Sequence, residues 1–371
     1  MQRSGEVWCP FIFLNHMSYL CPGKKDEMRN RKVLLVLLLV FTMLLSSFAF
    51  YGYQIAYASN ILVDKEDTIL LIEPDETFKS LQAKLYDNDY VQDLVSFSFM
   101  ARIMNYDISI KPGRYLLKKD MTNFDAIRML RIGQQQPVNI TFNNVRLIQD
   151  LGEKITTGIA LTPAAFDSAL NEFIATNEIG FNQKNVISLF IPNTYQVYYD
   201  ISGKQLLERM QSEYQRFWND TRTAKASKIG LDQKEVSVLA SIVQAESIKK
   251  EESKIIAGLY KNRLDKGIAL QADPTLVFAS GDFSLKRVLN IHKEVDSPYN
   301  TYKNRGLPPG PINMPTIAAL DAVLNYEEHQ YLYFCAKEDF SGYHTFAETL
   351  SEHNINARKF QRALNRQRIY R

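Results

Sequence analysis

The chain has 371 residues, of which 46% are hydrophobic and 23% charged, enough for two globular domains with buried cores. Its 44 basic and 41 acidic residues leave a net charge of +3, too balanced to favour nucleic acid as a partner. The sequence contains no HExxH, CxxC or GxSxG pattern and no phosphate-binding glycine loop. Metalloenzyme, nucleotide-dependent and serine-hydrolase functions are therefore unsupported, and we expect no metal and no cofactor.

One segment near the N-terminus is not globular. Val33–Ala56 carries no charge over 24 residues and as a helix would span about 36 Å, more than the roughly 30 Å hydrocarbon core of a bilayer. Basic residues precede this segment and acidic residues follow it, so the positive-inside rule predicts a single-pass inner-membrane anchor. Residues 1–32 would lie in the cytoplasm and the body in the periplasm. A cleaved signal peptide is the alternative, although the apolar run is long for one.

The first 27 residues show no clear periodicity, whereas Met28 opens a compact basic segment, MRNRK, directly before the apolar run. We therefore expect the natural start at Met28, and a peptide from residues 1–27 in the native protein would refute this. Beyond the anchor only Cys335 remains, so no disulfide is expected within the exported body. Cys335 is interpreted as a small buried hydrophobic residue on a strand.

After a tether over residues 57–67, residues 68–133 predict a small module. Its expected elements are a strand over 68–74, helices over 76–89 and 91–104, a Pro-Gly turn with a returning strand over 115–117, and a helix that ends at Gly133. This β-α-α-β pattern resembles a LysM-like glycan-binding module. The polar stretch Gln134–Pro137 is interpreted as a domain boundary.

Residues 138–371 predict a mixed α/β domain, so the whole chain is assigned to the α+β class. The expected elements are a strand over 138–142, helices over 145–155 and from 161, a β-rich segment over 186–200, and helices over 202–220, 233–247 and 254–267. Thr162 and Asp232 are placed to cap two of these helices, and Pro163 occupies a favourable first-turn position.

The helix capped by Asp232 carries an unusual residue. Val236, Leu239, Ala240 and Val243 recur at helical spacing and form an apolar stripe, and the next position on that stripe is Glu246. Burial disfavours the charged form of a carboxyl group and raises its pKa, which is what a general acid at neutral pH requires. Glu246 is therefore the candidate catalytic residue, the alternative being a carboxylate that merely pairs with a basic residue such as Arg263.

Four polar segments follow and are candidates for the sides of a groove around Glu246. Each could also be ordinary turn chemistry, because Asp-Pro, Asn-Thr and Pro-Gly are turn formers. The proline-rich segment GLPPGPINMP is expected to be stiff. The candidate ligand-binding residues in the four segments are Gln271, Asp273 and Thr275; Asn300, Thr301 and Tyr302; Pro308 and Pro309; and His344 and Thr345.

In this order and spacing, the motifs ASIVQAES, NRL, LQADPT, YNTY, GLPPGPI, HTF and EHN resemble the endolytic murein transglycosylase (YceG-like) family. The resemblance covers about Val236 to Asn354. It implies a single-pass inner-membrane enzyme that cuts peptidoglycan glycan strands internally, leaves 1,6-anhydro-muramic ends, and works near peptidoglycan synthases. The family's catalytic glutamate falls on Glu246. A second acidic residue that the family often carries two positions earlier is replaced here by Gln244.

A lone acidic residue suits this reaction. A glycan hydrolase usually needs a second carboxylate, whereas a lytic transglycosylase can use the 6-hydroxyl of its own substrate as the nucleophile. Two alternatives stay open: a muramidase-type hydrolase in which Asp273 is the second carboxylate, and a non-catalytic glycan-binding scaffold. Within the lytic reading, Gln271, Asn300 and His344 are the candidates for contacts with sugar hydroxyl or acetamide groups.

Overall fold

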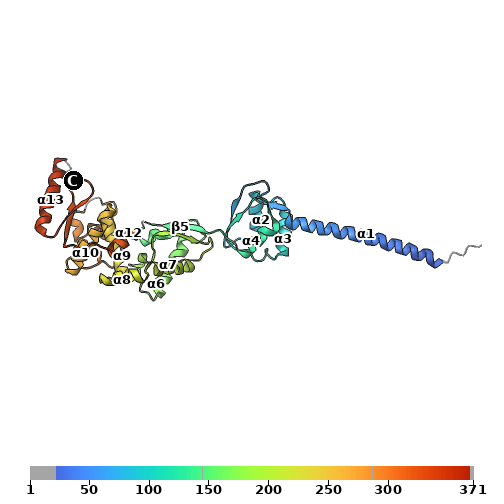
Figure 1. Cartoon of the computed structure of the whole chain (residues 1–371), viewed down its shortest axis with the longest axis horizontal. Coiled ribbons are helices and arrows are strands. Elements are labelled where there is room, and N and C mark those ends of the chain that lie inside the picture. Colours follow the sequence, from blue (N-terminus) through green and yellow to red (C-terminus); the bar gives the residue numbers. More distant parts are fainter. Residues whose placement is uncertain (1–21, 144, 286–287, 368–371) are drawn as a thin grey trace, which may run out of the picture. The chain divides into compact units, whose positions relative to one another are not determined.

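The computed structural model describes residues 22–143, 145–285 and 288–367, whose helices and strands are drawn in Figure 1. The chain divides into two compact units. The first contains the described residues through Asp67 together with Gln82–Ser109 and Leu117–Met129; the second contains Thr68–Leu81, Ile110–Leu116 and the described residues from Leu130 onward. The expectation of a start at Met28 concerns residues 1–27, of which the first 21 lie outside the described part.

The first unit begins with helix α1 (Pro22–Tyr57), which extends past both ends of the apolar run Val33–Ala56. Residues Arg29–Tyr57 are long and apolar enough to cross a membrane, and the most apolar stretch is not buried against other parts of the protein. Outward-facing apolar side chains of this number suit a lipid environment better than water. This helix is therefore a candidate membrane anchor or signal sequence.

A buried amide network fastens the end of α1 within the first unit. Asn60 Nδ2 donates to Asn123 Oδ1 at 2.7 Å and to the Asp93 carbonyl at 2.9 Å, while Asn123 Nδ2 donates to the Ile55 carbonyl at 2.8 Å. Asp93 in turn caps a helix by accepting from two backbone N–H groups. The elements held in this way are α1, β1 (Ser59–Ile61), α3 (Leu94–Ile103), β4 (Met121–Thr122) and α4 (Asn123–Ile132), with β1 and β4 antiparallel.

Two strands and a helix account for the remaining expected elements of residues 68–133. Strand β2 (Thr68–Ile72) is hydrogen-bonded to β3 (Gly113–Leu117), and α2 (Phe78–Asp87) follows β2 in the chain. The order β2, α2, α3, β3 reproduces the expected β-α-α-β pattern, and α4 ends just before Gly133, whose φ of 80° favours glycine.

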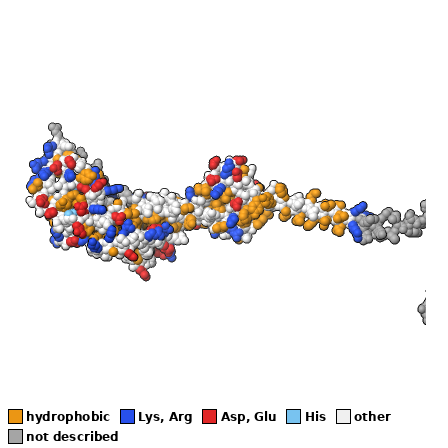
Figure 2. Space-filling model, in the orientation of Figure 1, with side chains coloured by type: hydrophobic (Ala, Val, Ile, Leu, Met, Phe, Trp, Pro, Cys, Tyr) orange, Lys and Arg blue, Asp and Glu red, His pale blue; other side chains and the backbone are white. Residues whose placement is uncertain are grey.

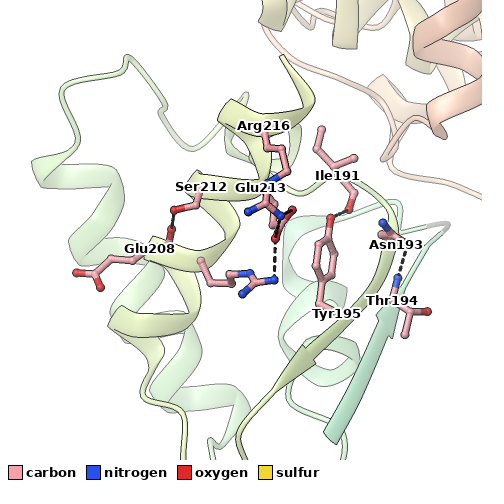
Figure 3. Close-up of polar contacts among 9 residues, drawn as sticks. Ile191, Asn193, Thr194, Tyr195, Glu208, Ser212, Glu213 and Arg216 are labelled. Atoms are coloured by element: carbon pink, nitrogen blue, oxygen red, sulfur yellow. Dashed lines mark hydrogen bonds and ion pairs between the residues drawn. The ribbon is translucent and has the colours of Figure 1, made fainter. Parts of the chain in front are cut away.

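A two-stranded antiparallel sheet opens the main part of the second unit. β5 (Val138–Phe142) pairs with β6 (Asn193–Val197) from Val138 opposite Val197 to Phe142 opposite Asn193. Figure 3 shows Tyr195 of β6 between the sheet and a neighbouring helix, with its hydroxyl donating to the Ile191 carbonyl at 2.6 Å. The helices of this part are α5 (Ile148–Ile155), α6 (Pro163–Thr176) and α7 (Gly203–Phe217), and Thr162 caps α6 as expected.

The segment 186–200 is only half β-structure, so the expectation of a β-rich segment is wrong for its first half. Val186–Leu189 forms a 3-10 turn in which all four residues are buried, and the strand begins only at Asn193. A continuous apolar run has no period that separates a strand from another buried conformation. The conformation of Val186–Leu189 is set instead by how its four buried side chains pack in the core.

The C-terminal half of the second unit is mainly helical. Its elements are α8 (Asp220–Lys228), α9 (Gln233–Glu246), α10 (Ser253–Asp265), α11 (Asp273–Ser280), α12 (Ile317–Leu324), the antiparallel pair β7 (Tyr333–Ala336) and β8 (His344–Ala347), and α13 (Leu350–Arg366), with 3-10 turns at Lys250–Glu252 and Asn290–Glu294. Asp232 caps α9 as expected. Cys335 lies on the strand β7 as expected, but it is half-buried and not fully buried.

Helix α9 is the centre of this half. It packs against α10, α11 and α12, and every residue from Val236 to Val243 is buried. The sequence predicted that only one face of this helix is buried. In the structure all faces of this stretch are buried, including the polar residues Ser237 and Ser241. The helix leaves the core at both ends, and Glu246 lies at its C-terminal end.

Candidate active site

Glu246 is the last residue of α9, and the chain turns into an extended conformation at Ser247. The C-terminus of a helix carries partial negative charge, which disfavours a second negative charge at the same place. The Glu246 side chain is half-buried, and its Oε1 accepts a hydrogen bond of 2.6 Å from the hydroxyl of Tyr260 on α10. The carboxyl group is thus held from one side by Tyr260 and is partly shielded from solvent.

The environment of Glu246 raises its pKa to about 7. Desolvation by the surrounding protein is the main cause, and the negative charge of Asp273 adds to it. The hydrogen bond from Tyr260 and the positive charge of Arg263 act in the opposite direction by stabilising the carboxylate. A carboxyl group with a pKa near neutrality can both donate and accept a proton at physiological pH.

A groove of about 1180 Å³ lies over Glu246. Its volume and its mixed lining of charged, polar and aromatic side chains suit a polar ligand with apolar faces better than a small apolar molecule. Arg146 lies 4.5 Å from the centre of the Phe283 ring, which holds that guanidinium over an aromatic face. The polar lining consists of Arg146, Asp150, Gln244, Glu246, Asp273 and Asn313, and the aromatic lining of Phe278, Phe283 and Phe360.

The proline-rich segment is clamped to α9. Gln244 Nε2 donates to Asn313 Oδ1 at 3.1 Å, and Gln244 Oε1 accepts from the Thr316 N–H at 2.7 Å. One turn earlier, Ser241 Oγ accepts from the Ile312 N–H at 3.0 Å. The residue that replaces an acidic side chain thus fixes one side of the groove, through Ile312 and Asn313. Of the two expected prolines, Pro308 is buried and Pro309 half-buried, and neither is among the residues that line the groove.

Gly310 allows the backbone of the proline-rich segment to pass close to the backbone at Lys184. A Cβ atom on Gly310 would lie 1.8 Å from the Lys184 carbonyl oxygen, so no other residue fits without moving the backbone.

The QADPT and YNTY segments lie against each other. Asp273 begins α11 and lines the groove, and its Oδ1 accepts a hydrogen bond of 2.6 Å from the Tyr302 hydroxyl. Thr301 Oγ1 accepts from the Ala272 N–H at 3.0 Å and shares a hydrogen bond of 2.8 Å with Thr275 Oγ1. These bonds fix the start of α11, and with it the carboxylate of Asp273.

Several expected ligand contacts in these two segments are structural instead. Asn300 is fully buried: its Nδ2 donates to two carbonyl oxygens within residues 293–295, at 2.8 and 2.9 Å, and its Oδ1 accepts from Tyr302 N–H at 3.0 Å. Thr275 and Thr301 are buried as well. The hydrogen bonds of these side chains hold the QADPT and YNTY segments in place. Gln271 is exposed, with a left-handed φ of 55° that costs energy for any residue other than glycine.

His344 reaches the site indirectly. Its Nδ1 lies 2.8 Å from Oε2 of the buried Glu252, whose Oε1 accepts from the His344 N–H at 2.8 Å. Ser247 Oγ donates to the same carboxylate at 3.3 Å, next to the catalytic candidate Glu246. His344 therefore positions the end of α9, and Thr345 lies half-buried on the same strand. Across the described residues, no cluster of three or more His, Cys, Asp and Glu side chains could hold a metal ion.

Tyr260, Glu252 and Arg146 are not among the site residues predicted from the sequence. One signal was available on α10, where Ile256, Leu259 and Arg263 share a helical face and the arginine interrupts an apolar stripe, as Glu246 does. Arg263 is indeed buried, but its guanidinium donates to the carbonyl groups of residues 269, 270 and 332, at 2.6 to 2.9 Å, and not to Glu246. The simple ion pair considered for Glu246 is therefore not formed.

Comparisons with known proteins relate this chain to one family. The family model described as the YceG-like family matches residues 70–359. The endolytic murein transglycosylase of Streptococcus pneumoniae is 27% identical over 359 residues, covering 88% of this chain and 64% of the relative. The enzyme of the same name from Bacillus subtilis is 43% identical over 122 residues, which is 33% of each chain. A solved structure of a putative yceG-like protein from Listeria monocytogenes has a TM-score of 0.49 and 26% identity, covering 78% of this chain and 98% of that one. The chain thus spans about two thirds of the length of the pneumococcal relative.

Proposed function

Because the chain belongs to the YceG-like family, we propose that it is an endolytic transglycosylase that cuts the glycan strands of peptidoglycan and leaves 1,6-anhydro-muramic ends. The observation that carries the proposal is Glu246, a carboxyl group with a pKa of about 7 that lines a groove of about 1180 Å³.

The proposed reaction needs one carboxyl group in two protonation states. Neutral Glu246 first donates its proton to the glycosidic oxygen, the bond from that oxygen to C1 breaks, and the leaving sugar departs as an alcohol. The carboxylate then takes the proton of the 6-hydroxyl on the remaining sugar, and that oxygen bonds to C1. The anhydro ring closes, no water is consumed, and Glu246 regains its proton.

The hydrogen bond from Tyr260 determines which carboxyl oxygen of Glu246 donates and accepts the proton. The Tyr260 hydroxyl donates to Oε1, so the proton of the neutral acid resides on Oε2, the atom left free for a substrate. Tyr260 is itself buried on α10 and is therefore a positioning residue in this proposal.

A muramidase-type hydrolase is the second candidate, because Asp273 lines the same groove as Glu246. Asp273 Oδ1 already accepts a short hydrogen bond from Tyr302, which occupies an oxygen that a nucleophile or water activator would use. In the scaffold reading, Glu246 would pair with a basic residue such as Arg263, and Arg263 bonds to backbone carbonyls instead. Both observations favour the single-carboxylate reaction.

The proposal extends to location and partners. Helix α1 would anchor the chain in the cell membrane with its body on the cell-wall side, since basic residues precede the apolar run. Residues 68–133 would serve as a LysM-like module that holds glycan near the groove. Cleavage on that side of the membrane would end the elongation of nascent strands beside peptidoglycan synthases.

Mass spectrometry of digested sacculi tests the function. The purified protein should release fragments with anhydro ends, which are lighter by one water than the reducing ends that a hydrolase makes. The matched variant E246Q, which keeps the shape but cannot exchange a proton, should release neither. Reducing ends would favour the muramidase, and intact sacculi with the unaltered protein would favour the scaffold.

A further inference from the structure

Helix α3 of the first unit presents an apolar stripe that the fold does not cover. Val95, Phe99 and Ile103 follow each other at i, i+4 and i+8 and are 79%, 52% and 59% exposed, and Ile108 in the turn after the helix is 81% exposed. At 100° per residue these three helical positions lie within about 80° of each other, on one face. A face of this kind on a soluble surface marks a contact with another apolar phase.

This face belongs to the unit that carries α1. Helix α3 contacts α1, Asn123 donates to the Ile55 carbonyl, and the Phe124 ring lies 5.5 Å from that of Tyr57. Figure 2 shows hydrophobic side chains gathered on the side of this unit from which α1 leaves.

The length of α1 sets the height of that side above a membrane. If the hydrocarbon core begins at Val33, about 20 residues of helix fill its roughly 30 Å, and the helix leaves the core near Gly52. Ile55 and Tyr57 then lie within about 8 Å of the core, in the headgroup layer. Tyr51, Tyr53 and Tyr57 are exposed there, as aromatic residues at a membrane surface are.

We propose that the exposed face of α3, with Ile108, docks on the same membrane that holds α1. The occupant is the headgroup and upper acyl region of the lipid bilayer. Arg102 lies on the same face as Val95 and is exposed, so its long side chain can reach lipid phosphates while its stem covers apolar surface. Two contacts, α1 through the bilayer and α3 on its surface, would fix the tilt of the first unit. This inference rests on the proposed anchor.

Spin-label accessibility in the full chain tests it. In a background with Cys9, Cys21 and Cys335 changed to Ser, single labels are placed at F99C, at L44C in the middle of α1, and at E208C on the polar face of α7 as the aqueous reference. The protein is reconstituted in vesicles of phosphatidylethanolamine and phosphatidylglycerol. Collision rates with oxygen, which partitions into lipid, and with a water-soluble nickel chelate then report depth.

We expect the oxygen-to-nickel ratio at residue 99 to exceed that at residue 208 severalfold and to fall below that at residue 44. An aqueous ratio at residue 99 with a lipid ratio at residue 44 would overturn the docking and leave the anchor standing, with a protein partner as the remaining occupant. An aqueous ratio at residue 44 would overturn the anchor itself, and the docking with it.

A second variant separates docking from folding. The triple change V95S/F99S/I103S removes exposed side chains only, so the thermal midpoint should stay within a few degrees of the parent. A label at I108C should lose its lipid-like ratio in this variant. An unchanged ratio at residue 108 would contradict a role for the stripe.

Discussion

At Glu246, the burial that raises the pKa also works against the stability of the fold. With a pKa of about 7 in the folded chain against 4.5 for the free side chain, the group binds its proton more tightly when folded. The penalty is therefore absent below pH 4.5, grows as the pH rises through this interval, and is complete above pH 7. The difference of 7 − 4.5 corresponds to about 3 kcal/mol.

The variant E246Q removes this penalty. We expect its free energy of unfolding to exceed that of the unaltered protein by up to about 3 kcal/mol at pH 8, and by little at pH 4.5. Urea unfolding of both proteins in the same detergent at the two pH values measures this. A difference that does not change with pH would mean that burial of the charge is not its cause.

Tyr260 supplies the second prediction at this scale. The variant Y260F removes the hydrogen bond to Glu246 Oε1, which stabilises the carboxylate. A hydrogen bond to a charged group is worth about 1.5–3 kcal/mol, so the pKa of Glu246 should rise by about one unit or more. The pH–activity profile should move to higher pH. A lower activity with an unchanged profile would assign Tyr260 to packing alone.

At the scale of elements, α9 and the proline-rich segment act as one piece because Gln244 joins them. The variant Q244A removes the bonds to Asn313 and Thr316 and should cost about 1–3 kcal/mol of stability. The activity should fall further than that loss explains, since one side of the groove is released, while the pH profile keeps its shape. Gln361, exposed on α13, provides the matched control Q361A. Full activity in Q244A would contradict the clamp.

Elements with a clear hydrophobic period or a capping residue could be predicted from the sequence. The conformation of a continuous apolar run without a cap could not. Asp232 and Thr162 predicted the starts of α9 and α6 correctly. A capping side chain bonds to backbone N–H groups only a few residues further along the chain, so its effect can be seen in the local sequence. The 3-10 turn Val186–Leu189 is decided by burial among distant residues, which no local pattern records.

The same limit holds for the site. Glu246 broke an apolar pattern and so could be recognised, whereas Asn300 has the composition of a ligand contact but is buried within its loop. Tyr260 lies 14 residues from Glu246 on the next helix, so their contact depends on how α9 and α10 pack.

At the scale of the whole molecule, the charges around the apolar run predict the orientation of the chain. A reporter fused after Arg371 should be active only if it is of the type that works outside the cytoplasm. The same reporter fused after Lys32 should be inactive and serves as the control. Activity of a cytoplasmic reporter after Arg371 would contradict the proposed substrate, which lies outside the cytoplasm.

The central claim is that one carboxyl group cleaves the glycan without water. Digestion of purified glycan strands in water enriched in oxygen-18, followed by mass spectrometry, tests this most directly. We expect the new ends to carry no oxygen-18, because the 6-hydroxyl of the substrate closes the ring, and E246Q to lose about 10²–10⁴ of the rate. One oxygen-18 atom at C1 of each new reducing end would show that water is the nucleophile and would contradict the account.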